Sequence, residues 1–221
     1  MLGHPDMRDV RNVIFDFDGV IADTEPGRMA ALRKVLRDNG YGDVELRGKD
    51  FLGVPSSTIL RRAVPGIAEE EVRRIIAERR RLLFSSPEEY IRVYDLARET
   101  VLDLAERGYV VLLATVNDAG VIASLLSAVG LAGAFAAVYS RERIYDEDRN
   151  VKRLEVILDD LRLDPGQTLI VEDSCFGIRS ARRSGIFCIC LNACQEACEA
   201  APDVHVRDYA ELRRFFGLPA R

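Results

Sequence analysis

Short apolar runs alternate along the chain with stretches in which apolar residues recur every three or four positions. The first run is Val13-Ile14-Phe15, and similar runs follow from residue 95 onward. Runs of this length predict buried strands, and the three-to-four spacing favours helices packed along one face. We therefore expect strands over residues 13–15, 109–114, 135–139, 168–171, 187–191 and 204–206, and helices over residues 96–106, 121–129, 151–161, 176–183 and 209–216.

Residues 24–90 contain no strand pattern, and apolar residues at helical spacing instead predict three helices there. Alternation of strands and helices in the rest of the chain predicts a parallel sheet with helices on both faces. The expected fold class is therefore α/β, a Rossmann-like sheet with an inserted all-helical domain. We expect residues 1–22 and 92–221 to form the sheet domain and residues 23–91 to form the insertion.

The charge of the chain narrows the choice of partner. Its 221 residues carry a formal net charge of −5, so no positive excess is available to neutralise phosphates of nucleic acid or of a membrane surface. The N-terminus has no apolar run typical of a signal segment, and the longest apolar stretch, residues 110–114, is too short to span a bilayer. We expect a cytoplasmic monomer whose partner is a small molecule.

Acidic residues stand where two of the expected strands end. Asp16 and Asp18 follow the first strand, and Glu172 and Asp173 follow the strand over residues 168–171. Two aspartates this close repel each other unless a cation lies between them or one of them carries a proton. The pair indicates a divalent metal site, a nucleophile beside a general acid, or both. A strand that merely ends in a polar turn is the alternative.

Four segments, taken in order, resemble the haloacid dehalogenase-like superfamily of phosphohydrolases. They are Asp16-Phe17-Asp18-Gly19-Val20, the strand ending at Thr115, a basic residue after it, and the stretch from Glu172-Asp173-Ser174-Cys175 to Ser184-Gly185. The resemblance covers nearly the whole chain. It implies a Rossmann-like core with a helical cap, Mg²⁺ as the cofactor, and hydrolysis of a small phosphorylated metabolite through an aspartyl-phosphate.

The resemblance also implies a role for each carboxylate. Asp16 would attack phosphorus and bind the metal with its other oxygen. Asp18 would protonate the leaving alkoxide and then deprotonate the attacking water, and its backbone carbonyl would be a metal ligand. Asp173 would be another ligand, and Glu172 would act directly or through a bound water, because Mg²⁺ usually keeps several waters.

The phosphoryl group needs donors and a cation. The resemblance implies that Thr115 and the amide of Val116 donate hydrogen bonds to it. The spacing common in the family places the cation at Asp148, which cannot serve, whereas Lys152 lies four residues later at the expected start of a helix. Only three of the 31 basic residues are lysines, which favours Lys152 over a merely solvated lysine. The substitutes are Arg149 and Arg143.

The inserted helices are implied to be a cap that closes over the site and contacts the substrate. Relatives of the β-phosphoglucomutase type have a histidine twelve residues after the nucleophile and basic residues for a second phosphate. This chain has Arg28 at the first position and Leu52 and Ser56 at the others. A mutase must hold a bisphosphate at both ends, so these differences favour hydrolysis. Arg28 and Ser56 are candidates for substrate contact, although a solvated helix face explains Arg28 equally well.

Two other functions stay open. One is a sugar phosphomutase of the β-phosphoglucomutase type, and the other is a catalytically weak binding protein with the same fold, which the displaced lysine suggests. Cys188, Cys190, Cys194 and Cys198 form a cluster whose spacing is not that of a usual zinc site. Because buried cysteine packs like a small hydrophobic residue, we expect these cysteines to pack in the core rather than bind metal.

Overall fold

The computed structural model describes residues 9–46, 56–146, 151–191 and 201–220. The chain forms two compact units. Met1–Ala22 and Val93–Arg221 make up the first, called here the sheet unit, and Asp23–Arg92 make up the second, called the inserted unit. Within the described residues, no helix is both long and apolar enough to cross a membrane.

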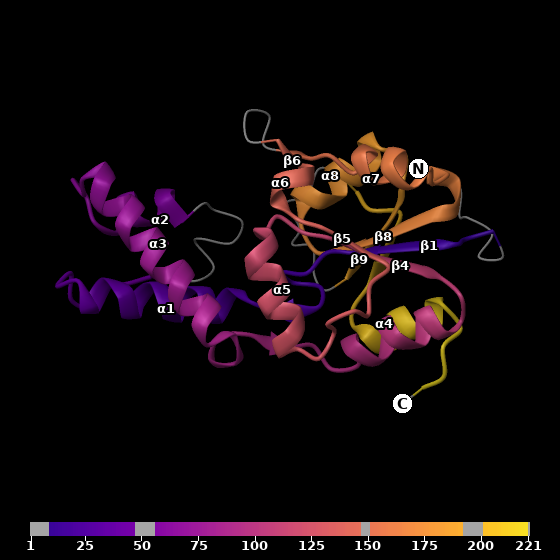
Figure 1. Ribbon diagram of the computed structural model, residues 1–221, viewed down its shortest axis with the longest axis horizontal. Coiled ribbons are helices and arrows are strands. Elements are labelled where there is room, and N and C mark those ends of the chain that lie inside the picture. Colours follow the sequence, from indigo (N-terminus) through magenta and orange to yellow (C-terminus); the bar gives the residue numbers. More distant parts are fainter. Residues whose placement is uncertain (1–8, 47–55, 147–150, 192–200, 221) are drawn as a thin grey trace. The chain divides into compact units, whose positions relative to one another are not determined.

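The described part of the sheet unit contains a six-stranded sheet in the order β10-β9-β8-β1-β4-β5 (Figure 1). All neighbouring strands are parallel, and Ile14 in β1 lies opposite Ile170 in β8 and Leu112 in β4. The central strands are buried on both faces, which explains why each is an unbroken apolar run in the sequence. The bounds are β1 Asn12–Phe15, β4 Val110–Ala114, β5 Ala137–Tyr139, β8 Thr168–Glu172, β9 Phe187–Leu191 and β10 Val204–Val206.

Helices cover both faces of this sheet. Helices α7 and α8 lie on one face, and α4 lies on the other with the C-terminal helix α9 beside it (Figure 1). On the first face Ile157 and Ile178 pack against Ile14 and Leu112 of the sheet. The predicted α/β fold class is confirmed. The helices are α4 Ala97–Glu106, α5 Ala119–Ala128, α6 Arg141–Ile144, α7 Glu155–Leu161, α8 Cys175–Arg183 and α9 Tyr209–Phe215, with a 3₁₀ turn, η3, at Pro165–Gln167.

The order of the strands reverses direction at the centre of the sheet. In chain order, β1, β4 and β5 extend the sheet in one direction, whereas β8, β9 and β10 extend it in the other. The direction reverses between β1 and β8. Open α/β sheets bind their ligands at the carboxyl ends of the strands at such a reversal. Asp16 follows β1 and Asp173 follows β8, so both residues lie at this point.

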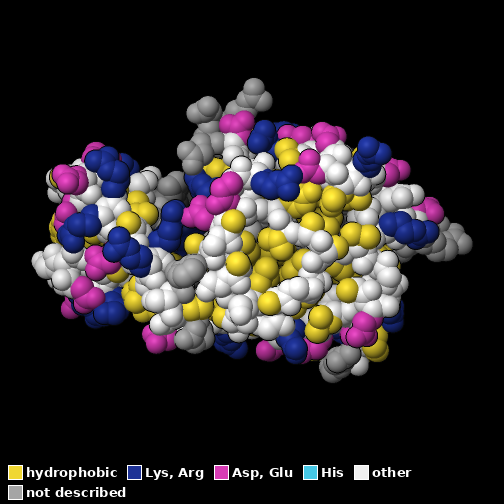
Figure 2. Space-filling model, viewed as in Figure 1, with side chains coloured by type: hydrophobic (Ala, Val, Ile, Leu, Met, Phe, Trp, Pro, Cys, Tyr) yellow, Lys and Arg dark blue, Asp and Glu magenta, His cyan; other side chains and the backbone are white. Residues whose placement is uncertain are grey.

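The inserted unit is built from helices. Leu32 and Val35 of α1 pack against Ile59 of α2 and against Val72 and Ile75 of α3, forming a separate apolar core. On the face drawn in Figure 2, acidic and basic side chains are interspersed over these helices, as expected for a solvated surface. The bounds are α1 Glu25–Asp38, α2 Ser56–Ala63 and α3 Glu69–Ser85, followed by a 3₁₀ turn, η2, at Pro87–Glu89.

Two pairs of very short strands were not predicted. The helix expected over residues 151–161 begins only at Glu155, because β7 (Val151–Lys152) instead pairs antiparallel with β6 (Tyr145–Asp146). The amide of Lys152 donates to Ser180 Oγ at 3.3 Å, so tertiary contacts rather than a local helix satisfy this backbone. The prediction that Lys152 starts a helix was therefore wrong. The second pair is β2 (Ala22–Asp23) with β3 (Arg92–Val93).

The cysteine cluster is only partly described. Cys188 and Cys190 lie on β9 with buried side chains, and both belong to the apolar core under α7 and α8. They pack there as small hydrophobic side chains. Cys194 and Cys198 lie outside the described residues.

Candidate active site

The end of β1 positions two aspartates. Asp16 directly follows the strand, and its amide donates to the carbonyl of Val171 on β8 at 3.0 Å, which keeps it in register with that strand. The chain then turns sharply at Gly19, whose φ of +74° is a conformation that favours glycine. Three successive amides of this turn bond to the carbonyl of Phe17, which fixes the loop that carries Asp18.

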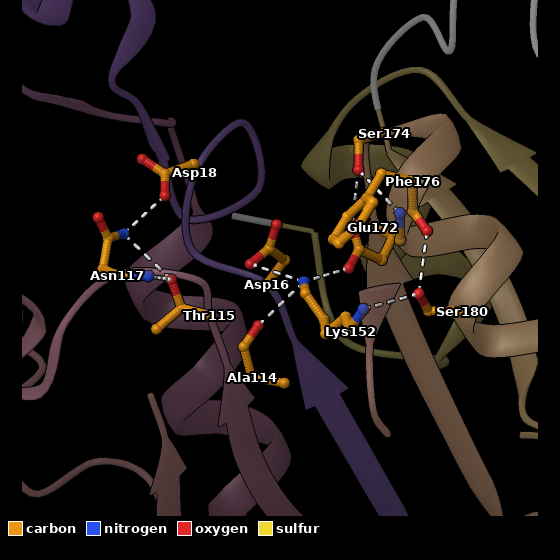
Figure 3. Close-up of polar contacts among 11 residues, drawn as sticks. Asp16, Asp18, Ala114, Thr115, Asn117, Lys152, Glu172, Ser174, Phe176 and Ser180 are labelled. Carbon is orange, nitrogen blue, oxygen red and sulfur yellow. Dashed lines mark hydrogen bonds and ion pairs between the residues drawn. The ribbon is translucent and has the colours of Figure 1, made fainter. Parts of the chain in front are cut away.

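Lys152 lies at the centre of the site (Figure 3). Its Nζ is 3.2 Å from Asp16 Oδ1 and 2.6 Å from Glu172 Oε1, and it donates to the carbonyl of Ala114 at 3.2 Å. Lys152 is 3% exposed, Asp16 7% and Glu172 0%, so these charges are almost fully removed from water. Such burial is tolerated because the opposite charges are in contact.

Glu172 is held by the protein on both of its oxygens. Oε1 binds Lys152, and the hydroxyl of Ser174 lies 3.3 Å from Oε2. The same hydroxyl caps α8 by accepting from the amide of Gly177. A Cβ added to Gly177 would lie 1.9 Å from the Glu172 Cδ, so only glycine leaves room for this carboxylate.

Three carboxyl groups lie close enough to share a metal ion. Ligand oxygens of Asp16, Glu172 and Asp173 lie within 4.8 Å of one another, and no other such group occurs among the described residues. Asp16 Oδ1 forms an ion pair with Lys152 but receives no hydrogen bond, although it is buried. A buried carboxylate oxygen that accepts no hydrogen bond, beside two further carboxylates, matches the oxygen ligands that Mg²⁺ prefers. The residues present therefore fit a divalent cation.

The charges of the site shift its pKa values. Burial, reinforced by the charge of Glu172, raises the pKa of Asp16 well above its ordinary value although Lys152 opposes this. Burial, followed by the charges of Glu172 and Asp18, raises the pKa of Asp173 to about 7. For Lys152, burial acts to lower the pKa, but Asp16 and Glu172 together outweigh it and the pKa is raised. A bound cation would favour the ionised form of these carboxyls.

Polar donors line the side of the site formed by the end of β4 (Figure 3). Thr115, which is 0% exposed, directly follows β4, and its hydroxyl oxygen accepts hydrogen bonds from Asn117. The amide of Val116 donates to no described residue. Asn117 also donates to Asp18 Oδ2 at 2.6 Å. This side of the site therefore offers neutral hydrogen-bond donors opposite the carboxylates.

A family model, Haloacid dehalogenase-like hydrolase, matches residues 13–191, which include every residue of this constellation. The chain belongs to the haloacid dehalogenase-like hydrolases. The predicted family is thereby confirmed.

Relatives in this family of hydrolases support the same class of enzyme. The chain is 25% identical over 220 residues to a phosphoglycolate phosphatase of Yersinia pseudotuberculosis, covering 96% of this chain and 95% of the relative. The crystal structure of a predicted phosphoglycolate phosphatase from Haemophilus somnus has a TM-score of 0.81 at 18% identity, covering 94% and 98%. A β-phosphoglucomutase of Clostridium difficile shares the fold with a TM-score of 0.70 at 17% identity, covering 94% and 97%. The expectation of a phosphoric monoester hydrolase is confirmed.

The structure brings together most of the residues expected in this hydrolase site. Arg143, a substitute for Lys152, is instead paired with Asp160 and lies over the ring of Tyr139 at 4.8 Å. The other substitute, Arg149, lies outside the described residues, as does Asp148.

The two cap candidates lie in the inserted unit. Arg28 is on α1, 3.8 Å from Glu25, and Ser56 is the first residue of α2. Sequence reasoning missed Asn117. Its position two residues after Thr115 was the available signal, but nothing local shows that it reaches Asp18, 99 positions earlier.

Proposed function

We propose that this chain is a Mg²⁺-dependent phosphatase that hydrolyses a small, anionic phosphate monoester through an aspartyl-phosphate. The observation that carries the proposal is the buried ammonium of Lys152 between Asp16 and Glu172, with Asp173 beside them at the strand reversal. Folded proteins rarely bury several carboxylates around one cation without a functional reason, because the desolvation cost is several kcal/mol per ion.

Asp16 is the nucleophile of the proposed reaction. One of its oxygens attacks phosphorus, the bond from phosphorus to the ester oxygen breaks, and the phosphoryl group is carried on Asp16. Water then attacks phosphorus and the bond to Asp16 breaks, which releases inorganic phosphate. Lys152 holds the carboxylate in position and contributes the positive charge that the incoming phosphate requires.

Asp18 supplies the acid and base for these two steps. It gives a proton to the departing alkoxide in the first step and takes a proton from water in the second, so the enzyme returns to its starting state. The hydroxyl of Thr115 and the amide of Val116 donate hydrogen bonds to the phosphoryl oxygens.

A divalent cation would be held by the side chains of Asp16 and Asp173 and by the backbone carbonyl of Asp18, with Glu172 acting directly or through water. When bound, the cation offsets the repulsion between the attacking carboxylate and the phosphate and aligns the two.

We propose that the inserted unit is the cap that recognises the substrate, and Arg28 and Arg79 are the residues that favour an anionic one. Arg79 lies one helical turn after Ile75 on the buried face of α3, and its Nε is buried without a hydrogen-bond partner. Burial and the nearby charge of Arg28 lower the pKa of Arg79 to about 10. Among the described residues, Glu25 is the one carboxylate that offsets these two cations, pairing with Arg28 at 3.8 Å and opposing the lowering of the Arg79 pKa. A pair of arginines with so few acidic partners suits an oxyanion such as a carboxylate that the substrate carries beside its phosphate.

The test is steady-state release of phosphate from an aryl phosphate, with Mg²⁺ and with EDTA. We expect Asp16→Asn to abolish turnover and EDTA to suppress it in the wild type, whereas Asp159→Asn, an exposed aspartate on α7, should leave it unchanged. Turnover that survives Asp16→Asn would refute the assignment. Rapid acid quenching followed by mass spectrometry would show whether Asp16 carries the phosphoryl group.

A further inference from the structure

The side-chain amide of Asn117 lies between Asp18 and Thr115 (Figure 3). Its Nδ2 donates to Asp18 Oδ2 at 2.6 Å and to Thr115 Oγ1 at 3.0 Å. The backbone amide of Asn117 donates to the same threonine oxygen at 3.1 Å. The carbonyl of Asn117 accepts from the amide of Arg141 at 2.9 Å, so the backbone that presents this side chain is itself held.

These bonds determine what the hydroxyl of Thr115 can do. A hydroxyl has two acceptor lone pairs and one proton. Asn117 donates to Oγ1 twice, so both lone pairs are occupied, and no described residue accepts the proton. Since Thr115 is 0% exposed, bulk water does not compete for the hydroxyl. The hydroxyl is therefore left as a donor, which is the role that a phosphoryl oxygen requires.

The same side chain distinguishes the two oxygens of Asp18. A protonated carboxyl group has one O–H and one oxygen that still accepts. The N–H of Asn117 keeps Oδ2 as an acceptor, so when Asp18 acts as the acid, Oδ1 is the oxygen that transfers the proton. A general acid whose proton is always on the same oxygen avoids a rearrangement before each transfer.

We propose that Asn117 is a positioning residue for the phosphatase reaction, setting Asp18 Oδ1 as the oxygen that transfers the proton and Thr115 as an obligate donor to the phosphoryl group. This inference rests on the proposed function, because it needs Asp18 as the acid and Thr115 as a phosphoryl ligand. Only a side chain with two N–H donors in one plane performs both tasks. Aspartate of the same shape would repel Asp18, and alanine would leave Thr115 free to accept.

The test compares leaving groups. A nitrophenolate leaves without a proton, so phosphorylation of Asp16 by a nitrophenyl phosphate does not need the acid, whereas an alkyl phosphate such as ethyl phosphate does. We measure the single-turnover release of each alcohol with Mg²⁺ present, in the wild type and in Asn117→Ala. Release from ethyl phosphate should fall by about 10²-fold, the lower end of the usual contribution of a general acid, because Asp18 is still present but no longer held. Release from the nitrophenyl ester should fall by only about tenfold, the worth of one hydrogen bond from Thr115.

Asn12→Ala is the matched control. Asn12 is the first residue of β1, at the opposite end of the strand from Asp16, and its Nδ2 donates to the hydroxyl of Thr168 at 3.2 Å. Asn12→Ala removes the same kind of hydrogen bond from the same sheet. It should therefore lower the melting temperature without changing the ratio of the release rates from ethyl phosphate and from the nitrophenyl ester. Asn117→Ser is measured in the same way should Asn117→Ala fail to fold.

An equal loss on both esters, or no loss, would overturn the role of Asn117 while leaving the phosphatase intact. A wild type that releases neither alcohol would instead refute the proposed function, and the role of Asn117 with it.

Discussion

Replacing Gly177 with alanine should destabilise the protein although it lies within a helix. In a helix interior, alanine is normally better than glycine by about 1 kcal/mol. Here the added Cβ would lie 1.9 Å from Glu172 Cδ and 2.1 Å from each carboxylate oxygen. Glu172 is 0% exposed and is bound to Lys152 at 2.6 Å, so it has no solvent into which to move.

The expected cost follows from these contacts. Overpacking a core costs about 1 to 3 kcal/mol, and separating a buried ion pair costs about 3 to 5 kcal/mol. After the helix gain of about 1 kcal/mol, a net loss of about 3 to 7 kcal/mol remains. For a protein of this size each kcal/mol lowers the melting temperature by about 2 to 4 °C, so the melting temperature should fall by at least about 6 °C. Because Lys152 also positions Asp16, kcat/KM should fall by about 10²-fold.

Two further variants serve as comparisons for Gly177→Ala. In each variant, stability is measured by denaturant unfolding and activity by phosphate release. Gly120→Ala, at an exposed helical position in α5, should stabilise the protein by up to about 1 kcal/mol and leave activity unchanged. Adding Glu172→Ala to Gly177→Ala removes the clash. The loss of stability in the double variant should therefore be about 2 kcal/mol smaller than the sum of the losses in the two single variants. Wild-type stability and full activity in Gly177→Ala would refute this account of the site.

Three further predictions concern the charges. Lys152→Met leaves Asp16 and Glu172 buried without a cation, so it should abolish turnover and lower the free energy of unfolding at neutral pH by about 3 to 5 kcal/mol. The loss should be smaller in acid, where the carboxyls are protonated, and a pH-independent loss would contradict this. The pKa of Asp173, raised to about 7, means that the metal-free folded state holds a proton that the unfolded state has lost. Its contribution to stability should therefore fall as the pH rises from about 4 to about 7. Mg²⁺ affinity measured by calorimetry should rise with pH, and Asp173→Asn should make this rise smaller, because only Asp16 then still loses a proton on binding. Arg79→Met should maintain or raise the melting temperature, because it removes an unpartnered buried donor. It should nevertheless raise KM about tenfold for a phosphate monoester that carries a carboxylate and not for ethyl phosphate, and equal KM changes would contradict an anion-binding role.

The residues that local patterns predicted are those at the ends of buried strands. Asp16 and Asp18, and Glu172 and Asp173, follow apolar runs, and a parallel sheet brings such ends to one edge. Lys152 was selected because lysine is rare in this chain, and the structure places it between Asp16 and Glu172. The helix predicted at Lys152 was wrong, because a two-residue strand is defined only by the strand it pairs with and has no periodicity of its own.

Asn117 and Arg79 show what local patterns do not reveal. The contact between Asn117 and Asp18 joins residues 99 positions apart and depends on how two loops approach each other. Arg79 continues the apolar stripe of Val72 and Ile75 at the spacing of one helical turn, so a close reading of that stripe would have found it. A cation on the buried face of a helix is a stronger functional signal than the solvated arginines around it.

The charges on the two sides of the site couple the binding of the phosphate to the binding of a cation. One side holds the carboxyl groups of Asp16, Glu172 and Asp173 with the ammonium of Lys152. The side formed by the end of β4 offers neutral donors, and the amide of Asn117 there is bound to a fourth carboxyl group, that of Asp18. A phosphate dianion that approaches this arrangement is repelled unless a further positive charge is present. Binding of the substrate and of a divalent cation must therefore be coupled, each raising the affinity for the other by the same factor. Titration with vanadate, a phosphate mimic, should give tight binding with Mg²⁺ and weak binding in EDTA, and equal affinities would show that Lys152 and the neutral donors suffice on their own.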